Sequence, residues 1–197
     1  MEEQYWTNRW EEGRTGWDIG YCSTPLKTYF DQLSNRQLKI LIPGAGNAYE
    51  AEYLFTNGFT SVHVLDISPL PLQALKKRQP DFPDAQLMQE DFFEHQGTYD
   101  LIIEQTFFCS FEPHPKTRKS YAEKMHELLL PGGKLVGLWF KHSITEDSKR
   151  PFGGSQKEYE GYFGPFFDVN TFEDCHNSIK PRMGNELFGI FVKKTFL

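Results

Sequence analysis

Short apolar runs alternate with helix-like segments along most of this 197-residue chain. The clearest run, residues 38–42, leads into the turn Pro43-Gly44-Ala45-Gly46-Asn47, a pattern typical of a buried strand that precedes a helix. Two later runs are followed by the acids Asp66 and Glu104. Strands that alternate with helices in this way predict a mostly parallel, doubly wound α/β sheet.

The same patterns predict the individual elements. We expect helices over residues 2–12, 24–32, 48–57, 70–78 and 117–129, the second of them capped by Ser23. We expect strands over residues 38–42, 62–65, 86–88, 99–103 and 134–140. Only a loop separates two final strands, 166–171 and 187–193, which predicts a C-terminal antiparallel hairpin. No repeat or linker divides the chain, so we expect one domain over 1–197.

Composition narrows the class of protein. A net charge of −6 disfavours a nucleic-acid partner, because phosphate binding depends on clustered Lys and Arg. The polar start of the chain lacks the pattern of a secretory signal, and no apolar run approaches the roughly 20 residues that span a bilayer. Three scattered cysteines indicate a reducing compartment and no metal site. We therefore expect a cytoplasmic monomer or weak dimer, without a membrane partner, that acts on a small molecule.

Polar and glycine residues follow the first three predicted strands, where open α/β sheets bind ligands. Gly44 and Gly46 let backbone N–H groups approach an anion, and Asp66 is placed to accept hydrogen bonds from ribose hydroxyls. Asp91 and Phe92 offer a carboxylate and a ring to an adenine base. Each fragment alone also fits an ordinary turn or helix cap, but their order together predicts a nucleotide site.

The residue after the glycine turn distinguishes between nucleotides. Dinucleotide-binding folds require Gly or Ala at the third position of Gly-x-Gly-x-x-Gly, and this chain has the bulky Tyr49 there. The substitution disfavours NAD and FAD and favours S-adenosylmethionine, whose single carboxylate needs less room than a pyrophosphate. An NAD-dependent oxidoreductase remains an alternative.

Several motifs resemble one enzyme family. Trp6-x3-Trp10-x2-Gly13-x-Thr15-x-Trp17-Asp18 resembles the N-terminal signature of the thiopurine S-methyltransferase superfamily. The resemblance implies a Rossmann-like class I methyltransferase fold. The stretch 100–113, with its Phe-Phe-Cys and Glu-Pro elements, is most similar to the thiol and halide methyltransferase branch. Residues 41–47, 65–68, 130–135 and 178–182 match further family motifs.

The resemblance also implies a cofactor site for S-adenosylmethionine, which leaves as S-adenosylhomocysteine. Trp6, Trp10 and Trp17 would lie against the cofactor as part of a helical lid over residues 1–35, and indole rings attract cations such as a sulfonium by roughly 0.5–2 kcal/mol. Alternatively, these rings anchor the first helix as ordinary core. The remaining cofactor residues implied are Gly44, Ala45, Gly46, Asp66, Ile67, Asp91, Phe92, Glu104 and Gln105.

The acceptor is less well defined. Many plant halide methyltransferases carry Tyr where this chain has Gln105, which puts halide or thiocyanate in doubt. The loop over 141–155 is individual to this chain, so we expect it to select the acceptor. A thiolate needs no general base, so we predict no dedicated catalytic residue and only positioning by Gln105, Phe107 and Phe108. Acceptor-binding candidates are Phe107, Phe108, Phe152, Tyr162, Arg14 and Arg182.

These patterns together predict a methyltransferase acting on a thiol or hydrosulfide. Halide, thiocyanate or a heteroaromatic thiol as acceptor, and a non-catalytic binder of S-adenosylmethionine, stay open. Cys109 is expected to pack in the core rather than act as a nucleophile. His114 and His142 are expected to be solvated, as is the charged face of residues 116–127.

Overall fold

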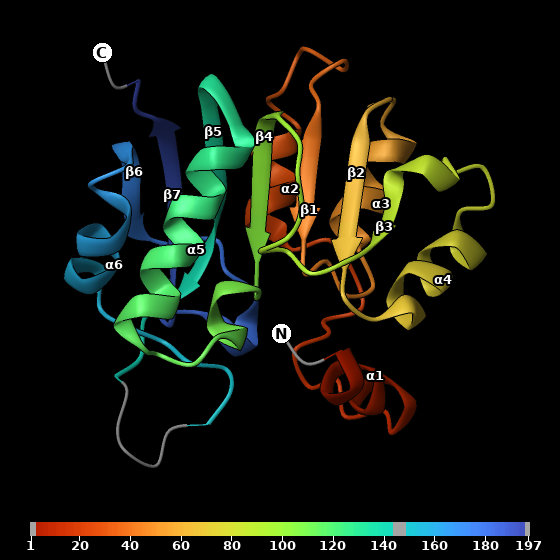
Figure 1. Cartoon of the computed structure of the whole chain (residues 1–197), viewed down its shortest axis with the longest axis horizontal. Helices are drawn as coiled ribbons and strands as arrows, with labels where there is room; N and C mark the ends of the chain where they lie inside the picture. The colour runs from red at the N-terminus through yellow and green to blue at the C-terminus, as the bar shows by residue number, and fades with distance from the viewer. Residues whose placement is uncertain (1–2, 144–148, 196–197) are drawn as a thin grey trace. The chain divides into compact units, whose positions relative to one another are not determined.

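The computed structural model describes residues 3–143 and 149–195. The chain forms two compact units, Met1–His95 and Gln96–Leu197, and each has strands and helices of its own (Figure 1). Within the described residues, no helix has the length and hydropathy needed to cross a bilayer. The single domain expected over 1–197 stays a prediction.

Three parallel strands form the sheet of the first unit, coloured orange to yellow-green in Figure 1. Their order is β3-β2-β1, with Ile42 opposite Val64 and Val64 opposite Leu87. Every residue of β1 is buried, as its apolar run predicts. The strands are β1 (Ile40–Pro43), β2 (Val62–Asp66) and β3 (Leu87–Gln89), and the helices are α1 (Glu3–Glu11), α2 (Thr24–Phe30), α3 (Tyr49–Thr56) and α4 (Pro69–Arg78).

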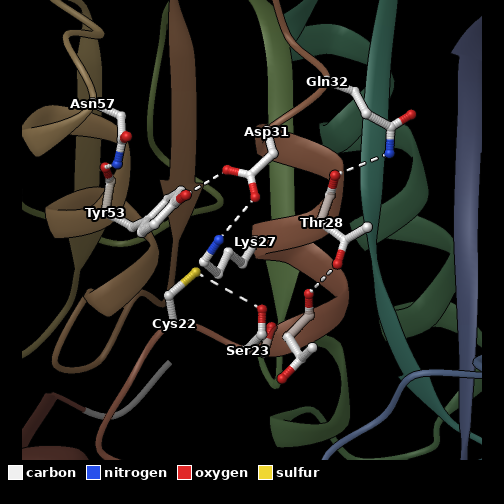
Figure 2. Close-up of polar contacts among 9 residues, drawn as sticks. Cys22, Ser23, Lys27, Thr28, Asp31, Gln32, Tyr53 and Asn57 are labelled. Atoms are coloured by element: carbon white, nitrogen blue, oxygen red, sulfur yellow. Dashed lines mark hydrogen bonds and ion pairs between the residues drawn. The ribbon is translucent and has the colours of Figure 1, made fainter.

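A carboxylate joins α2 to α3 in the first unit. Asp31, just after α2, accepts hydrogen bonds from the Lys27 ammonium at 2.8 Å and from the Tyr53 hydroxyl (Figure 2). The hydrogen bond from Lys27 is the main cause that holds the pKa of Asp31 below its ordinary value. Phe30 stacks on Tyr53 with ring centroids 6.3 Å apart. Because the polar groups are exposed, the stacking of the two rings contributes most of the free energy that holds α2 against α3.

The second unit contains the order β4-β5-β7-β6 (green to blue in Figure 1). β4 pairs parallel with β5, whereas β7 pairs antiparallel with both β5 and β6, which confirms the predicted hairpin. Trp139 of β5 is buried against three aromatic rings of this unit. The elements are β4 (Tyr99–Gln105), α5 (Pro115–Leu128), β5 (Leu129–Phe140), α6 (Gln156–Phe163), β6 (Phe167–Asp174) and β7 (Glu186–Lys193), with the 3-10 turns η2 (Phe108–Ser110) and η3 (Lys180–Arg182).

Every helix and strand expected from the sequence is present, with shifted ends, but some local details differ from the predictions. Ser23 occupies the N-cap position of α2, yet its side chain makes no capping bond. α6 was not expected, and β5 already begins at Leu129. His114 is exposed, as expected, and its ring also caps α5 by accepting from the Lys116 N–H. The charged face of α5 is partly buried, because Arg118 and Lys124 lie inside.

Candidate functional site

A sharp bend follows β1 in the first unit. Gly44 and Gly46 have φ of +57° and +52°, a conformation that glycine adopts without steric cost. Ala48 has φ +54°, which is strained for a residue with a Cβ. The N–H of Ala45 donates to the carbonyl of Leu65 at 3.2 Å. The bend therefore lies beside the carboxyl end of β2.

Asp66, the last residue of β2, is tied to this bend. Its side chain is only 7% exposed, and its Oδ2 accepts from the Gly46 N–H at 3.0 Å while Oδ1 accepts from the Ser68 N–H at 2.9 Å. Burial raises the pKa of Asp66 to about 6, although both hydrogen bonds act in the opposite direction. Each carboxylate oxygen can accept a second hydrogen bond. The group is thus suited to hydroxyl donors.

The three predicted tryptophans form one cluster over the bend. Trp17 contacts Trp6 and Trp10 edge to face, with centroids 5.6 and 5.7 Å apart. A Cβ built on Gly46 would lie 3.4 Å from the Trp10 ring, so the indole covers the glycine closely. Trp6, Trp10 and Trp17 are each half-buried, and the lid and the core interpretations of these rings both stay predictions. The Arg9 guanidinium lies 5.3 Å from the centroid of Trp17.

The other cofactor candidates of this unit are buried, half-buried or engaged in local hydrogen bonds. Asp91 accepts from the Phe93 N–H at 2.9 Å and so closes a local turn. The ring of Phe92 is buried against Phe93, with centroids 5.2 Å apart. Ile67 is half-buried next to Asp66. Of these three, Phe92 packs inside the unit rather than presenting an exposed ring.

In the second unit, Glu104 organises the turn after β4. The residue is 0% exposed, and its Oε1 accepts from the Phe107 and Phe108 N–H groups at 2.8 and 2.9 Å. Its Oε2 accepts from the Tyr121 hydroxyl. Burial raises the pKa of Glu104 to about 7. Both oxygens are engaged within the protein, so Glu104 holds the turn.

Two features mark this turn as unusual. Thr106 has φ +55°, a strained conformation for a β-branched residue and one that clusters at ligand sites. The adjacent Gln105 is half-buried, and its side-chain oxygen has no hydrogen-bond partner among the described residues. A strained backbone beside an unsatisfied amide is consistent with the positioning role predicted for Gln105.

Three acceptor candidates meet around η2. Phe107 packs on Phe111, and Phe108 packs on Tyr121, with ring centroids 4.9 and 4.8 Å apart. The N–H of Phe152 donates to the carbonyl of Cys109 at 2.8 Å, which brings the segment 149–155 of the loop onto η2. We call Phe107, Phe108 and Phe152 the phenylalanine wall.

The other acceptor candidates of this unit, Tyr162 and Arg182, have neighbours outside the wall residues. Tyr162 lines a surface groove, to which no wall residue contributes. Arg182 is buried and pairs with Glu186 at 3.3 Å. Arg14 belongs to the first unit, where it is exposed and pairs with Glu12. The groove around Tyr162 is lined by Pro115, Lys116, Lys119, Gly161, Pro165 and Phe166.

Among the residues that the structure describes, the nucleophilic and metal-binding residue types form no further centre. Cys109 is buried, and burial raises the pKa of its thiol above the ordinary value, which suits packing. His142 is half-buried rather than fully solvated, and its ring hydrogen-bonds the carbonyl of Pro151. Across residues 3–143 and 149–195, no group of three His, Cys, Asp or Glu side chains is arranged to hold a metal ion. Residues 144–148 of the predicted acceptor loop lie outside the described residues.

Comparison with known families agrees with this geometry. The family described as thiopurine S-methyltransferase (TPMT) matches residues 1–195. The chain belongs to this family. A probable thiol methyltransferase 2 of Arabidopsis thaliana is 33% identical over 96% of this chain and 85% of its own. A thiocyanate methyltransferase 1 of Brassica oleracea is 32% identical over 98% and 86%.

Solved structures show the fold. A 1,6-didemethyltoxoflavin-N1-methyltransferase of Burkholderia thailandensis, crystallised with S-adenosylhomocysteine, matches with a TM-score of 0.75 over 98% of this chain and 87% of that one, at 16% identity. A TehB-like SAM-dependent methyltransferase of Corynebacterium glutamicum matches with a TM-score of 0.65 over 98% of both chains, at 17% identity. The S-methyltransferase has the Rossmann-like class I fold predicted, and the oxidoreductase alternative is excluded by its family.

Proposed function

We infer that this S-methyltransferase takes its methyl group from S-adenosylmethionine and transfers it to a small thiol or hydrosulfide. The observation that supports S-adenosylmethionine as the methyl donor is the cluster of Trp6, Trp10 and Trp17 over the glycine bend, beside the buried Asp66. Indole rings stabilise a cation, and a carboxylate accepts from hydroxyls. These residue types fit the sulfonium and the ribose of that cofactor.

The residues of the first unit would bind and orient the cofactor. The N–H groups around Gly44, Ala45 and Gly46 would face its carboxylate end, and Asp66 its ribose. When bound, the cofactor supplies an electrophilic methyl group on a positively charged sulfur. The indoles would favour that charge and exclude water from it, as a lid over residues 1–35 of one catalytic domain.

The residues of the second unit support an acceptor that is nucleophilic by itself. The phenylalanine wall is buried and apolar, and the carboxylate nearest to it, Glu104, already accepts three hydrogen bonds. Among the described residues of that arrangement, no base is free to take a proton from an alcohol or amine. A thiolate or hydrosulfide reacts without one, so alignment and dehydration supply the acceleration.

Charge near the wall favours an anionic form of the acceptor. The Arg150 guanidinium lies 5.6 Å from the ring centroid of Phe152, and its Nε donates to the Ser110 carbonyl at 2.7 Å. Arg14 and Arg182, the cations chosen from the sequence, are each paired with a carboxylate. The position of Arg150 beside Phe152 supports a thiolate, and also keeps thiocyanate as the second candidate.

An acceptor screen tests this function. The full chain is incubated with labelled S-adenosylmethionine and, separately, hydrosulfide, small alkyl thiols, thiophenol, thiocyanate and iodide. We expect labelled methyl sulfides from hydrosulfide and thiols at higher kcat/KM than from thiocyanate or iodide. No transfer to any thiol overturns the proposal, and tight binding of S-adenosylhomocysteine without any transfer indicates a non-catalytic binder.

The cysteines bear on the setting in which the enzyme works. Cys22, Cys109 and Cys175 are free thiols, two of them buried. Free thiols persist in reducing compartments. We propose that the protein acts in the cytoplasm as a monomer or weak dimer.

A further inference from the structure

A fully buried arginine lies behind the phenylalanine wall. Arg118 of α5 is 0% exposed, and its guanidinium lies 5.0 Å from the ring centroid of Phe108. Its Nη1 donates to Glu158 of α6 at 2.6 Å, and its Nη2 donates to the carbonyl of Gly153 at 2.7 Å. Its Nε has no hydrogen-bond partner among the described residues.

Burial of an arginine side chain costs free energy. An ion pair with a single carboxylate does not need all the donors of the planar guanidinium. The guanidinium bridges three parts of the unit, which are the wall residue Phe108, the helix α6 and the segment 150–155. A lysine offers one point of charge and cannot reproduce this planar fork. The arrangement therefore indicates a geometric role for Arg118.

The segment 150–155 is held closely at the site where Arg118 binds it. A Cβ on Gly153 would lie 2.4 Å from the His142 carbonyl oxygen, and a Cβ on Gly154 would lie 2.8 Å from the Tyr159 ring. Arg150 and Phe152 attach the same segment to the carbonyls of Ser110 and Cys109 in η2. Only glycines allow the chain to approach this closely.

From these contacts we propose that Arg118 is a positioning residue that fixes Phe152 in the phenylalanine wall and thereby sets the affinity for the methyl acceptor. The inference rests on the proposed function. Arg118 does not touch the acceptor; it acts through Gly153 and Phe108. Removal of its fork takes away the hydrogen bond to the Gly153 carbonyl, so the segment that carries Phe152 loses one attachment and the wall loses its shape on that side.

The test compares Arg118→Lys with Lys119→Gln, a change at the neighbouring exposed position of α5. We expect Arg118→Lys to raise KM for the best thiol acceptor about tenfold, with the dissociation constant for S-adenosylhomocysteine unchanged. A merely structural role would lower kcat through a smaller folded fraction and leave the acceptor KM unchanged. Lys119→Gln should match the wild type in every measurement.

A second variant keeps the test decisive if Arg118→Lys does not fold. Gly154→Ala displaces the same segment from Tyr159 without changing the arginine, and should raise the same KM. Hydrogen exchange of residues 149–155 gives a readout without turnover, and we expect it to accelerate about tenfold in both variants but not in Lys119→Gln.

The outcomes separate the two proposals. A wild type that methylates no thiol overturns the proposed function, while exchange in the segment still tests the role of Arg118. An active wild type whose folded variants keep the acceptor KM, or keep the exchange rate of 149–155, overturns the role of Arg118. Equal losses of acceptor and S-adenosylhomocysteine binding also overturn it.

Discussion

The backbone N–H of Gly46 donates to Oδ2 of Asp66 at 3.0 Å, which joins the bend after β1 to the end of β2. The bond links the two sequence motifs from which a nucleotide site was predicted. Burial raises the pKa of the Asp66 carboxyl to about 6, although this bond acts in the opposite direction.

Replacement of Asp66 should weaken cofactor binding. Asp66→Ala removes a charged acceptor for two hydroxyl groups, so we expect the affinity for S-adenosylhomocysteine to fall by about 1–3 kcal/mol. Titration calorimetry at pH 7.5 measures this change. Unchanged affinity would mean that the ribose is bound elsewhere.

The wild-type affinity should also depend on pH. Since the pKa of Asp66 is raised to about 6, the carboxylate is protonated as the pH falls through that value and becomes a weaker acceptor. We expect the dissociation constant for S-adenosylhomocysteine to rise between pH 7.5 and pH 5, and Asp66→Asn to lack this inflection. A flat wild-type profile would contradict the assignment.

Trp10 should distinguish the charged cofactor from its neutral product. Trp10→Ala removes an indole from the cluster, so S-adenosylmethionine should lose roughly 0.5–2 kcal/mol more binding free energy than S-adenosylhomocysteine. The control is Trp139→Ala, a core residue that is 1% exposed, which should destabilise the fold by about 3–5 kcal/mol. If Trp10→Ala behaves like the control and binds both compounds normally, the indole belongs to the core.

Much of the cofactor half was predictable, because its signals are local in the sequence. The bend needs glycine at Gly44 and Gly46, and Asp66 follows an apolar strand directly, so order alone brings them to one sheet edge. The helix α6 escaped prediction because it is short and contains Gly161, so its formation depends on packing of Tyr159 and Phe163.

Arg118 was missed for a different reason. Its charge suggested a solvated face, yet Arg118, Tyr121, Ala122 and Met125 recur at the spacing of one helical stripe, and all four are buried. The stripe could have identified the arginine as inward-facing. Its partners Gly153 and Glu158 are distant in sequence, so no local pattern predicts them.

Replacement of Arg182 should change the kcat/KM for charged and for neutral acceptors equally. It pairs with the buried Glu186, which also accepts from the Ser178 hydroxyl at 2.8 Å. Because this charge is neutralised inside the unit, Arg182→Lys should change kcat/KM for thiocyanate and for a neutral thiol by the same factor. A selective loss with thiocyanate would restore Arg182 as the anchor of an anionic acceptor.

Glu104 should make the stability of the protein depend on pH. Its pKa is about 7 in the folded protein and near 4.5 in the unfolded chain, so the native state binds the proton more tightly between these values. The free energy of unfolding therefore falls as the pH rises from about 4.5 to about 7, by up to about 3 kcal/mol from this group. Glu104→Gln keeps the shape and lacks the charge, so the difference between the two unfolding curves should show this slope.

Tyr121→Phe provides the matched comparison for Glu104. The variant removes the hydroxyl that donates to Oε2, so the buried carboxylate loses a donor and its pKa should rise further. We expect Tyr121→Phe to be less stable than the wild type above pH 7 and closer to it below pH 5, where Glu104 is protonated in both. Denaturant unfolding at pH 5 and pH 8 measures both differences. Equal destabilisation at the two pH values would indicate that the hydroxyl does not act through the charge of Glu104.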